Sequence, residues 1–224
     1  ILAAYLAKQM GVPIGRLICA SNENKVLYDF FSTGTYDRKR PFILTSSPSM
    51  DILISSNLER LIYLSCGCDA EKTAELMGEL SSDGKYTVTE DMRKFMSDFW
   101  GGYAGEEENA AVIRSVFQSC GYLMDTHTGV AAAVSRQYKE KTGDERKMLI
   151  ASTASPFKFA GSVLKAVNGT GEGMDEFAVV DELSRVSGMP VPAAVEEIRT
   201  APVRHTRKCG PENMEETVAE ILGC

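Results

Sequence analysis

The stretch that decides the fold is Ile14-Gly15-Arg16-Leu17-Ile18-Cys19-Ala20. A short apolar run of this kind is typical of a strand that is buried in a parallel sheet. The apolar spacing before it predicts an amphipathic helix over residues 1–11, which ends at Gly11 and Pro13. Ser21-Asn22-Glu23-Asn24 follows the strand at its carboxyl end, where open α/β sheets place their ligand-binding loops. The chain therefore opens with a helix, a strand and a polar loop.

The same order recurs at Lys147-Met148-Leu149-Ile150-Ala151-Ser152-Thr153, a second apolar run that ends in hydroxyl groups. Between the two runs, apolar residues at three-to-four spacing predict a strongly helical segment over about 68–120. Helices that alternate with a few buried strands indicate an α/β fold, a mainly parallel sheet covered by helices. We assign residues 1–224 to one domain, and we expect further strands of its sheet to lie in an upstream portion of the protein.

A further helix is predicted from the stretch Thr45-Ser46-Ser47-Pro48-Ser49, which precedes an apolar run over 50–64. Serine is a favoured helix cap, and proline suits the first helical turn. Asp51 would then lie near the positive end of the helix. These signals predict a helix over 50–64.

Composition excludes several classes of function. The chain has 224 residues and a net charge of -7, which argues against a nucleic-acid or anionic-membrane surface. No apolar stretch approaches the roughly 20 residues of a membrane-spanning helix. Six cysteines are too sparse for a disulfide scaffold and fit reduced thiols in a cytoplasmic protein, and the Cys66-Gly67-Cys68 spacing is too short for the usual zinc site. We therefore expect a cytoplasmic protein with a small-molecule partner and no metal.

Two polar clusters, residues 21–24 and 152–155, are the candidate site that the residues alone suggest. Both follow predicted parallel strands, so both would lie at the same rim of the sheet and could orient a polar small molecule. The alternative is that they cap the helices that follow them. His127 lies two residues after Asp125, an arrangement that could orient an imidazole for proton transfer or could only cap a helix.

The run Ser47-Pro48-Ser49-Met50-Asp51-Ile52-Leu53-Ile54-Ser55-Ser56-Asn57-Leu58-Glu59-Arg60-Leu61 resembles the threonine synthase family. The resemblance continues over residues 1–13, over 21–36, in Asp125-Thr126-His127-Thr128-Gly129-Val130, and in Thr153-Ala154-Ser155-Pro156-Phe157-Lys158-Phe159. It covers most of the chain. The family commonly has proline where Thr126 stands and histidine where Ser155 stands.

The resemblance implies the large, C-terminal cofactor-binding domain of an enzyme with the tryptophan synthase β-like fold. It implies pyridoxal phosphate as cofactor and conversion of O-phospho-L-homoserine and water to L-threonine and phosphate. The Thr153 hydroxyl would bond the pyridine nitrogen, Ile1 and Leu2 would lie beside the cofactor phosphate, and Asn22 and Asn24 would face the cofactor from the rim.

The family's catalytic Schiff-base lysine lies in a Phe-Lys-Asp run upstream of the part that this chain matches, and no such run occurs in this sequence. The resemblance therefore assigns the chain no catalytic residue, predicts that it is inactive alone, and makes the missing N-terminal portion of the same enzyme its partner. Two alternatives stay open: another enzyme of this fold, such as a threonine dehydratase or cysteine synthase, and a non-catalytic fragment.

Overall fold

The computed structural model describes residues 1–223, which divide into two compact units. The first, Ile1–Pro190, holds both sheets and the helices α1 to α9. The second begins at Val191 and holds α10 (Ala193–Thr200) and α11 (Met214–Leu222). No helix among the described residues combines the length and the apolar character needed to cross a bilayer.

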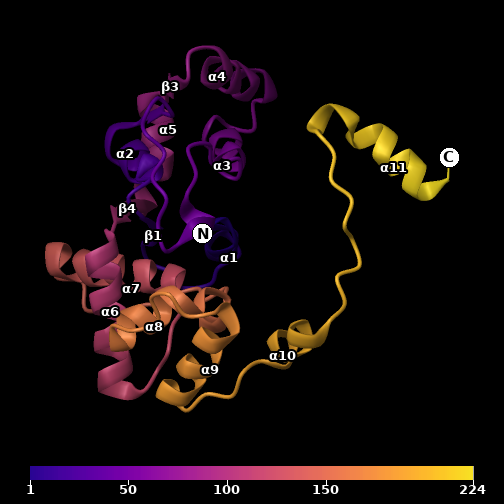
Figure 1. Cartoon of the computed structure of the whole chain (residues 1–224). Coiled ribbons are helices and arrows are strands. Elements are labelled where there is room, and N and C mark those ends of the chain that lie inside the picture. Colours follow the sequence, from indigo (N-terminus) through magenta and orange to yellow (C-terminus); the bar gives the residue numbers. More distant parts are fainter. Residues whose placement is uncertain (224) are drawn as a thin grey trace. The chain divides into compact units, whose positions relative to one another are not determined.

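A parallel pair of strands lies at the centre of the first unit (Figure 1). Strand β1 (Leu17–Ser21) pairs with β4 (Phe99–Tyr103), so that Ser21 lies opposite Tyr103. The strand expected over 14–20 and the parallel sheet are thus confirmed, in a chain that is rich in helices. No sequence pattern predicted β4, because it contains Gly101 and Gly102 and glycine weakens strands.

The glycines of β4 are explained by the helices that pack on it. A Cβ atom at Gly101 would lie 3.1 Å from the Tyr28 Cα of α2 (Val26–Thr33). A Cβ atom at Gly102 would lie 2.5 Å from the Val134 Cγ1 of α7 (Thr126–Thr142). The backbone of β4 is therefore approached so closely from these helices that side chains would be excluded.

The helix predicted over 1–11 is present, and the segment predicted to be helical over about 68–120 holds three α-helices separated by two short strands. Several helices of the first unit have clear ends. Local signals set these ends, such as Gly34, which closes α2 with a φ of 79°, and Asp69, whose side chain accepts the Lys72 N–H at the start of α4. The other helices of the first unit are α1 (Leu2–Gln9), α3 (Leu58–Ser65), α4 (Ala70–Ser82), α5 (Glu90–Phe95), α6 (Glu106–Cys120), α8 (Ala160–Asn168) and α9 (Glu176–Ser187).

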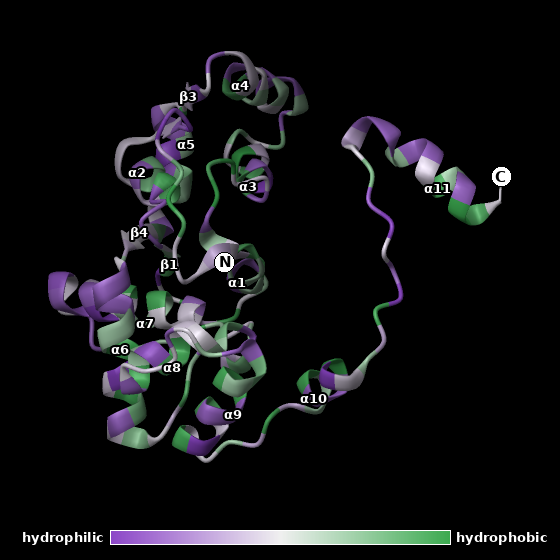
Figure 2. Ribbon diagram, in the orientation of Figure 1, coloured by the Kyte–Doolittle hydropathy of each residue, from purple (hydrophilic) through white to green (hydrophobic). Residues whose placement is uncertain are grey.

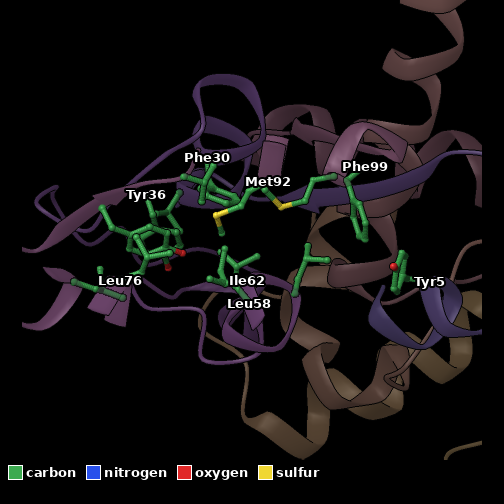
Figure 3. Packing of buried hydrophobic residues seen from close by; sticks show 14 of the residues in the cluster. Tyr5, Phe30, Tyr36, Leu58, Ile62, Leu76, Met92 and Phe99 are labelled. Carbon is green, nitrogen blue, oxygen red and sulfur yellow. The ribbon is translucent and has the colours of Figure 1, made fainter. Parts of the chain in front are cut away.

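A second, antiparallel pair of strands carries the main hydrophobic cluster. Strands β2 (Thr35–Asp37) and β3 (Lys85–Thr87) place Tyr36 opposite Tyr86. The cluster extends from these tyrosines, past Ile62, to Tyr5 at its other end (Figure 3). Because its members come from α1, α2, α3, α4 and α5 as well as the strands, this cluster ties the helical middle to the parallel sheet.

The structure corrects two of the predicted elements. The helix expected over 50–64 begins only at Leu58, and the capping signals before it form a short 3-10 turn, Pro48–Met50. The strand expected over 147–153 joins neither sheet within the described part of the chain. It is an irregular segment with Leu149 97% exposed, because no neighbouring strand is present to receive its backbone hydrogen bonds.

The second unit is two helices on an irregular segment. Its residues 204–208, which include Arg204, Arg207 and Lys208, are exposed. Arg207 pairs with Glu220 of α11 at 3.2 Å. Hydrophobic and hydrophilic residues alternate along α11 (Figure 2), and Met214, Val218 and Ile221 are all more than half exposed.

Cys19 of β1 offers a test of the central sheet. Burial raises the pKa of its thiol to about 11, which leaves roughly one thiolate in a thousand at pH 8. We expect iodoacetamide at pH 8 to modify the exposed Cys68 and Cys120 while Cys19 stays unmodified until denaturant is added. Peptide mass spectrometry reads the sites directly. Equal labelling of Cys19 and Cys120 in the folded protein would show that β1 is not buried.

Candidate functional site

The loop that follows β2 is held at the carboxyl end of β1 by two buried amides. The Asn22 Nδ2 lies 2.8 Å from Thr45 Oγ1 and 2.7 Å from Asp51 Oδ1. The Asn24 Nδ2 donates to the Ile43 carbonyl at 2.7 Å, and its Oδ1 accepts the Ile43 N–H at 3.0 Å. Both asparagines are almost fully buried, so their side chains serve this loop and do not cap α2.

Asp51 is the acceptor at the centre of this loop. Its Oδ1 accepts from Asn22, Asn24 at 3.0 Å and the Thr45 hydroxyl at 2.8 Å, while its Oδ2 accepts the Thr45 N–H at 2.9 Å. A carboxylate that accepts these hydrogen bonds cannot also accept the N–H groups at the start of a helix. This explains why α3 begins seven residues later, at Leu58. We call residues 43–51, with Asn22 and Asn24, the asparagine-held loop.

A second anchor reaches the same loop from α7. The Asp125 side chain is fully buried and caps this helix, accepting the His127 N–H at 2.9 Å and the Thr128 N–H at 3.4 Å. The same oxygen lies 3.0 Å from His127 Nδ1. The other carboxylate oxygen accepts the Thr128 hydroxyl. The Asp125 carboxylate therefore caps the helix and also orients the imidazole.

The imidazole of His127 has both ring nitrogens occupied. Its Nε2 accepts the Ser49 N–H at 3.1 Å, so the ring proton is on Nδ1 and points to Asp125. The Phe159 ring packs on it with a centroid distance of 4.7 Å. In this arrangement His127 anchors the asparagine-held loop and has no free nitrogen for proton transfer.

Thr153 lies beside this anchored region, at the end of the irregular segment that was expected to be a strand. Its neighbour Ser152 has its Oγ 2.9 Å from the Thr128 Oγ1, next to the start of α7. Thr153 is exposed and makes no side-chain hydrogen bond within residues 1–223. Ser155, in contrast, caps the turn Pro156–Phe159 by accepting the Phe157 N–H at 3.2 Å. The capping alternative is therefore right for Ser155 and leaves the Thr153 hydroxyl available.

Ile1 and Leu2 stand at the first turn of α1, which has no acidic residue and no side-chain cap. Lys8, in the last turn, donates to the Gly15 carbonyl at 2.9 Å and pairs with Asp98, and both partners precede the parallel strands. The last turn of α1 therefore lies near the amino ends of the two strands, and the first turn lies at the other end of the helix. Its unpaired N–H groups and positive helix end suit an anion such as phosphate.

The acidic start of α6 differs sharply from this first turn. Glu106, Glu107 and Glu108 open that helix and, with Glu23, line an open hollow. Such a charge repels a phosphate group, so an anionic ligand would be directed away from α6 and toward α1. Glu106 also accepts the Ser46 N–H at 3.2 Å, which gives the asparagine-held loop a third anchor.

The sequence reasoning did not anticipate the parts played by Asp51 and Ser47. Ser47 is fully buried and lies 3.0 Å from Asn22 Nδ2. A signal was available, because two asparagines directly after a buried strand need partners when they are buried themselves. Their partners come from residues more than 15 positions away, which no local pattern reveals.

Lys158 is exposed, with its Nζ 5.4 Å from the centroid of the Phe159 ring. Its side chain does not enter the region formed by the asparagine-held loop and the start of α7. Within the described residues, no lysine bonds to the anchors Asp51 and Asp125. The arrangement thus supplies hydroxyls, amides and helix N–H groups that can bind and orient a small anionic ligand.

Comparison with known proteins agrees with this arrangement. A family model described as threonine synthase, C-terminal, matches residues 128–207. Human threonine synthase-like 1 is 42% identical over 169 residues, covering 75% of this chain and 22% of the relative. Threonine synthase of Saccharomyces cerevisiae is 36% identical over 204 residues, covering 84% of this chain and 40% of the relative.

Two solved structures that match the chain are also threonine synthases. A crystal structure of threonine synthase from Brucella melitensis, described as bound to PLP, matches with a TM-score of 0.70 and 34% identity, covering 84% of this chain and 42% of that one. The crystal structure of threonine synthase from yeast matches with a TM-score of 0.81 and 29% identity, covering 99% of this chain and 45% of that one. This chain thus spans less than half the length of the relatives it matches.

The fold and the rim of polar groups define a domain of the tryptophan synthase β-like class of pyridoxal-phosphate enzymes. Within that class, the chain belongs to the threonine synthase family. The relatives named above do not favour a threonine dehydratase or a cysteine synthase.

Proposed function

We propose that the protein carrying this chain is a cytoplasmic threonine synthase, which converts O-phospho-L-homoserine and water to L-threonine and phosphate with pyridoxal phosphate as cofactor. The observation that carries the proposal is the yeast threonine synthase fold, matched over 99% of the chain. The cofactor, when bound, withdraws electrons from the substrate carbons while the phosphate group leaves and water adds.

The residues of this chain would bind and orient the cofactor. The first turn of α1, with Ile1 and Leu2, would receive the cofactor phosphate, because it offers unpaired N–H groups and no acidic residue. The Thr153 hydroxyl would bond the ring nitrogen. A neutral hydroxyl, unlike a carboxylate, does not stabilise a protonated ring nitrogen, so Thr153 would limit how strongly the ring withdraws electrons.

Asn22 and Asn24 would affect cofactor binding indirectly, by holding the asparagine-held loop in place. Their amides are engaged by Thr45, Asp51 and Ile43, so we propose that they fix the loop beside the cofactor and do not contact the ring with their own side chains. A rigid loop costs less conformational entropy when the ligand binds.

The partner of this chain would be an N-terminal portion of the same enzyme, which would also supply the catalytic lysine. The segment 147–153 supports this proposal, since it is an apolar run in an exposed, irregular conformation with Leu149 97% exposed. A strand from the N-terminal portion would pair with it and bury Leu149. On this proposal the chain alone is inactive.

Replacing Thr153 with alanine in the whole enzyme tests the proposed function. We expect kcat to fall about tenfold, the value of one neutral hydrogen bond, and the cofactor absorption band to shift. Thr153→Ser, which keeps a hydroxyl, should restore both. Phosphate release from O-phospho-L-homoserine measures the rate. If Thr153→Ala leaves the rate and the spectrum unchanged, Thr153 does not contact the cofactor.

A further inference from the structure

Asp125 makes more contacts than a helix cap requires. Capping needs one side-chain oxygen that accepts from the N–H groups of the first turn, and Oδ1 does this for His127 and Thr128. The carboxylate also engages the imidazole through Oδ1 and the Thr128 hydroxyl through Oδ2. The last two contacts lead away from α7, to Ser49 and to Ser152.

The branch through Thr128 is a chain of hydroxyl groups that ends beside Thr153. The proton of the Thr128 hydroxyl points to the Asp125 carboxylate, which is the stronger acceptor. The Ser152 Oγ lies 2.9 Å from Thr128 Oγ1, which continues the chain of hydroxyl groups beyond Thr128. Ser152 directly precedes Thr153. The buried carboxylate of Asp125 therefore fixes the chain, through Thr128, at the residue before Thr153.

The branch through His127 keeps the carboxylate itself in place. The Nδ1–H group donates to Asp125 while Nε2 accepts the Ser49 N–H. Asp125 is thus held between the start of α7 and the asparagine-held loop, and its side chain is 0% exposed. A carboxylate fixed on two sides is a rigid reference point for the third contact, the hydroxyl of Thr128.

Thr153 needs such a reference point. It lies on an irregular segment, is exposed, and makes no side-chain hydrogen bond of its own within residues 1–223. Only its neighbours can define its position. The Ser152–Thr128 contact is the hydrogen bond that joins this segment to α7.

We propose that Asp125 is a positioning residue that, through the Thr128 and Ser152 hydroxyls, fixes Thr153 against the cofactor ring. The proposal rests on the proposed function, which gives Thr153 its place at the ring nitrogen. Asp125 does not touch the cofactor or the substrate. Its effect is on the geometry of the Thr153 contact and therefore on the cofactor's electronic properties.

The test uses Thr128→Val in the whole enzyme, which removes the hydroxyl and keeps the shape of the side chain. We expect kcat to fall about three- to tenfold with little change in KM, and the cofactor absorption band to shift in the direction seen for Thr153→Ala. Thr128→Ser should restore both, because it returns the hydroxyl. The matched control is Thr142→Val at the last residue of α7, whose hydroxyl donates to the Tyr138 carbonyl at 2.7 Å, and it should change neither.

The outcomes separate this proposal from the proposed function. If Thr153→Ala shifts the spectrum but Thr128→Val only lowers the melting temperature, Asp125 is a helix cap and the positioning role is wrong while the function stands. If Thr153→Ala itself changes nothing, the role of Thr153 fails, and the positioning role fails with it. Should Thr128→Val not fold, Ser152→Ala replaces it, because it breaks the same chain of hydroxyls without disturbing the cap.

Discussion

Replacing Asp51 with alanine is expected to lower the free energy of unfolding of the chain by about 3 kcal/mol, the cost of leaving the buried amides of Asn22 and Asn24 without their charged acceptor. The carboxylate accepts from the amides of Asn22 and Asn24 and from both the N–H and the hydroxyl of Thr45. Alanine leaves these donors without their shared acceptor, and the amides of Asn22 and Asn24 are almost fully buried, so water compensates them poorly. Urea denaturation followed by circular dichroism measures the change.

Two further variants isolate the cause. Asp51→Asn keeps the shape and one acceptor oxygen but turns an NH2 group toward donors, so it should destabilise the chain nearly as much. Asp91→Ala is the control, since the Asp91 side chain is 94% exposed and its ion pair with Lys94 is at the surface. An Asp51→Ala chain that is as stable as Asp91→Ala would mean that the asparagine-held loop contributes nothing to the fold.

The contacts of Asp51 show what can and cannot be predicted from a sequence. The ends of α2 and α4 were predictable because Gly34 and Asp69 act on their own helix, within a few residues. The helix over 50–64 was predicted wrongly by the same rules. Its serine, proline and aspartate are good local signals, but Asp51 is bound instead by Asn22 and Asn24, 29 and 27 residues earlier.

The two strand errors have different physical causes. Strand β4 was missed because Gly101 and Gly102 read as strand breakers, whereas the close approach of α2 and α7 requires them. The strand over 147–153 was predicted from a genuine apolar run, and the structure leaves it unpaired. An apolar pattern indicates which segments can join a sheet. Whether a segment pairs depends on a neighbouring strand, and the described residues provide none for 147–153.

The contacts made by the candidate site residues could be predicted only in part. The clusters after β1 and around Thr153 were located from their positions after apolar runs. The use of Asn22 and Asn24 to hold a loop, and of His127 to anchor Ser49, could not be predicted, because those partners are distant in sequence. The assignment of Thr153, Ile1 and Leu2 to the cofactor remains a prediction.

Replacing Tyr36 with alanine should lower the free energy of unfolding by about 4 kcal/mol, because it empties a large volume in the main cluster. Tyr36 is 1% exposed and stacks on Tyr86 with a centroid distance of 5.4 Å and an interplanar angle of 3°. Its hydroxyl donates to the Leu53 carbonyl at 3.0 Å and accepts the Ser55 N–H at 2.7 Å. The side chain therefore joins the antiparallel sheet to the segment that leads into α3.

Tyrosine-to-phenylalanine changes divide that loss into packing and hydrogen bonding. Tyr36→Phe keeps the stacked ring and leaves the Leu53 and Ser55 backbone groups unpaired, so about 1–3 kcal/mol of the loss should remain. Tyr86→Phe is the matched control, since the Tyr86 hydroxyl makes no hydrogen bond within residues 1–223, and we expect it to change stability by less than about 0.5 kcal/mol. Equal losses for the two phenylalanine variants would show that the Tyr36 hydroxyl does not hold the 53–55 segment, and the stacking alone would then account for its burial.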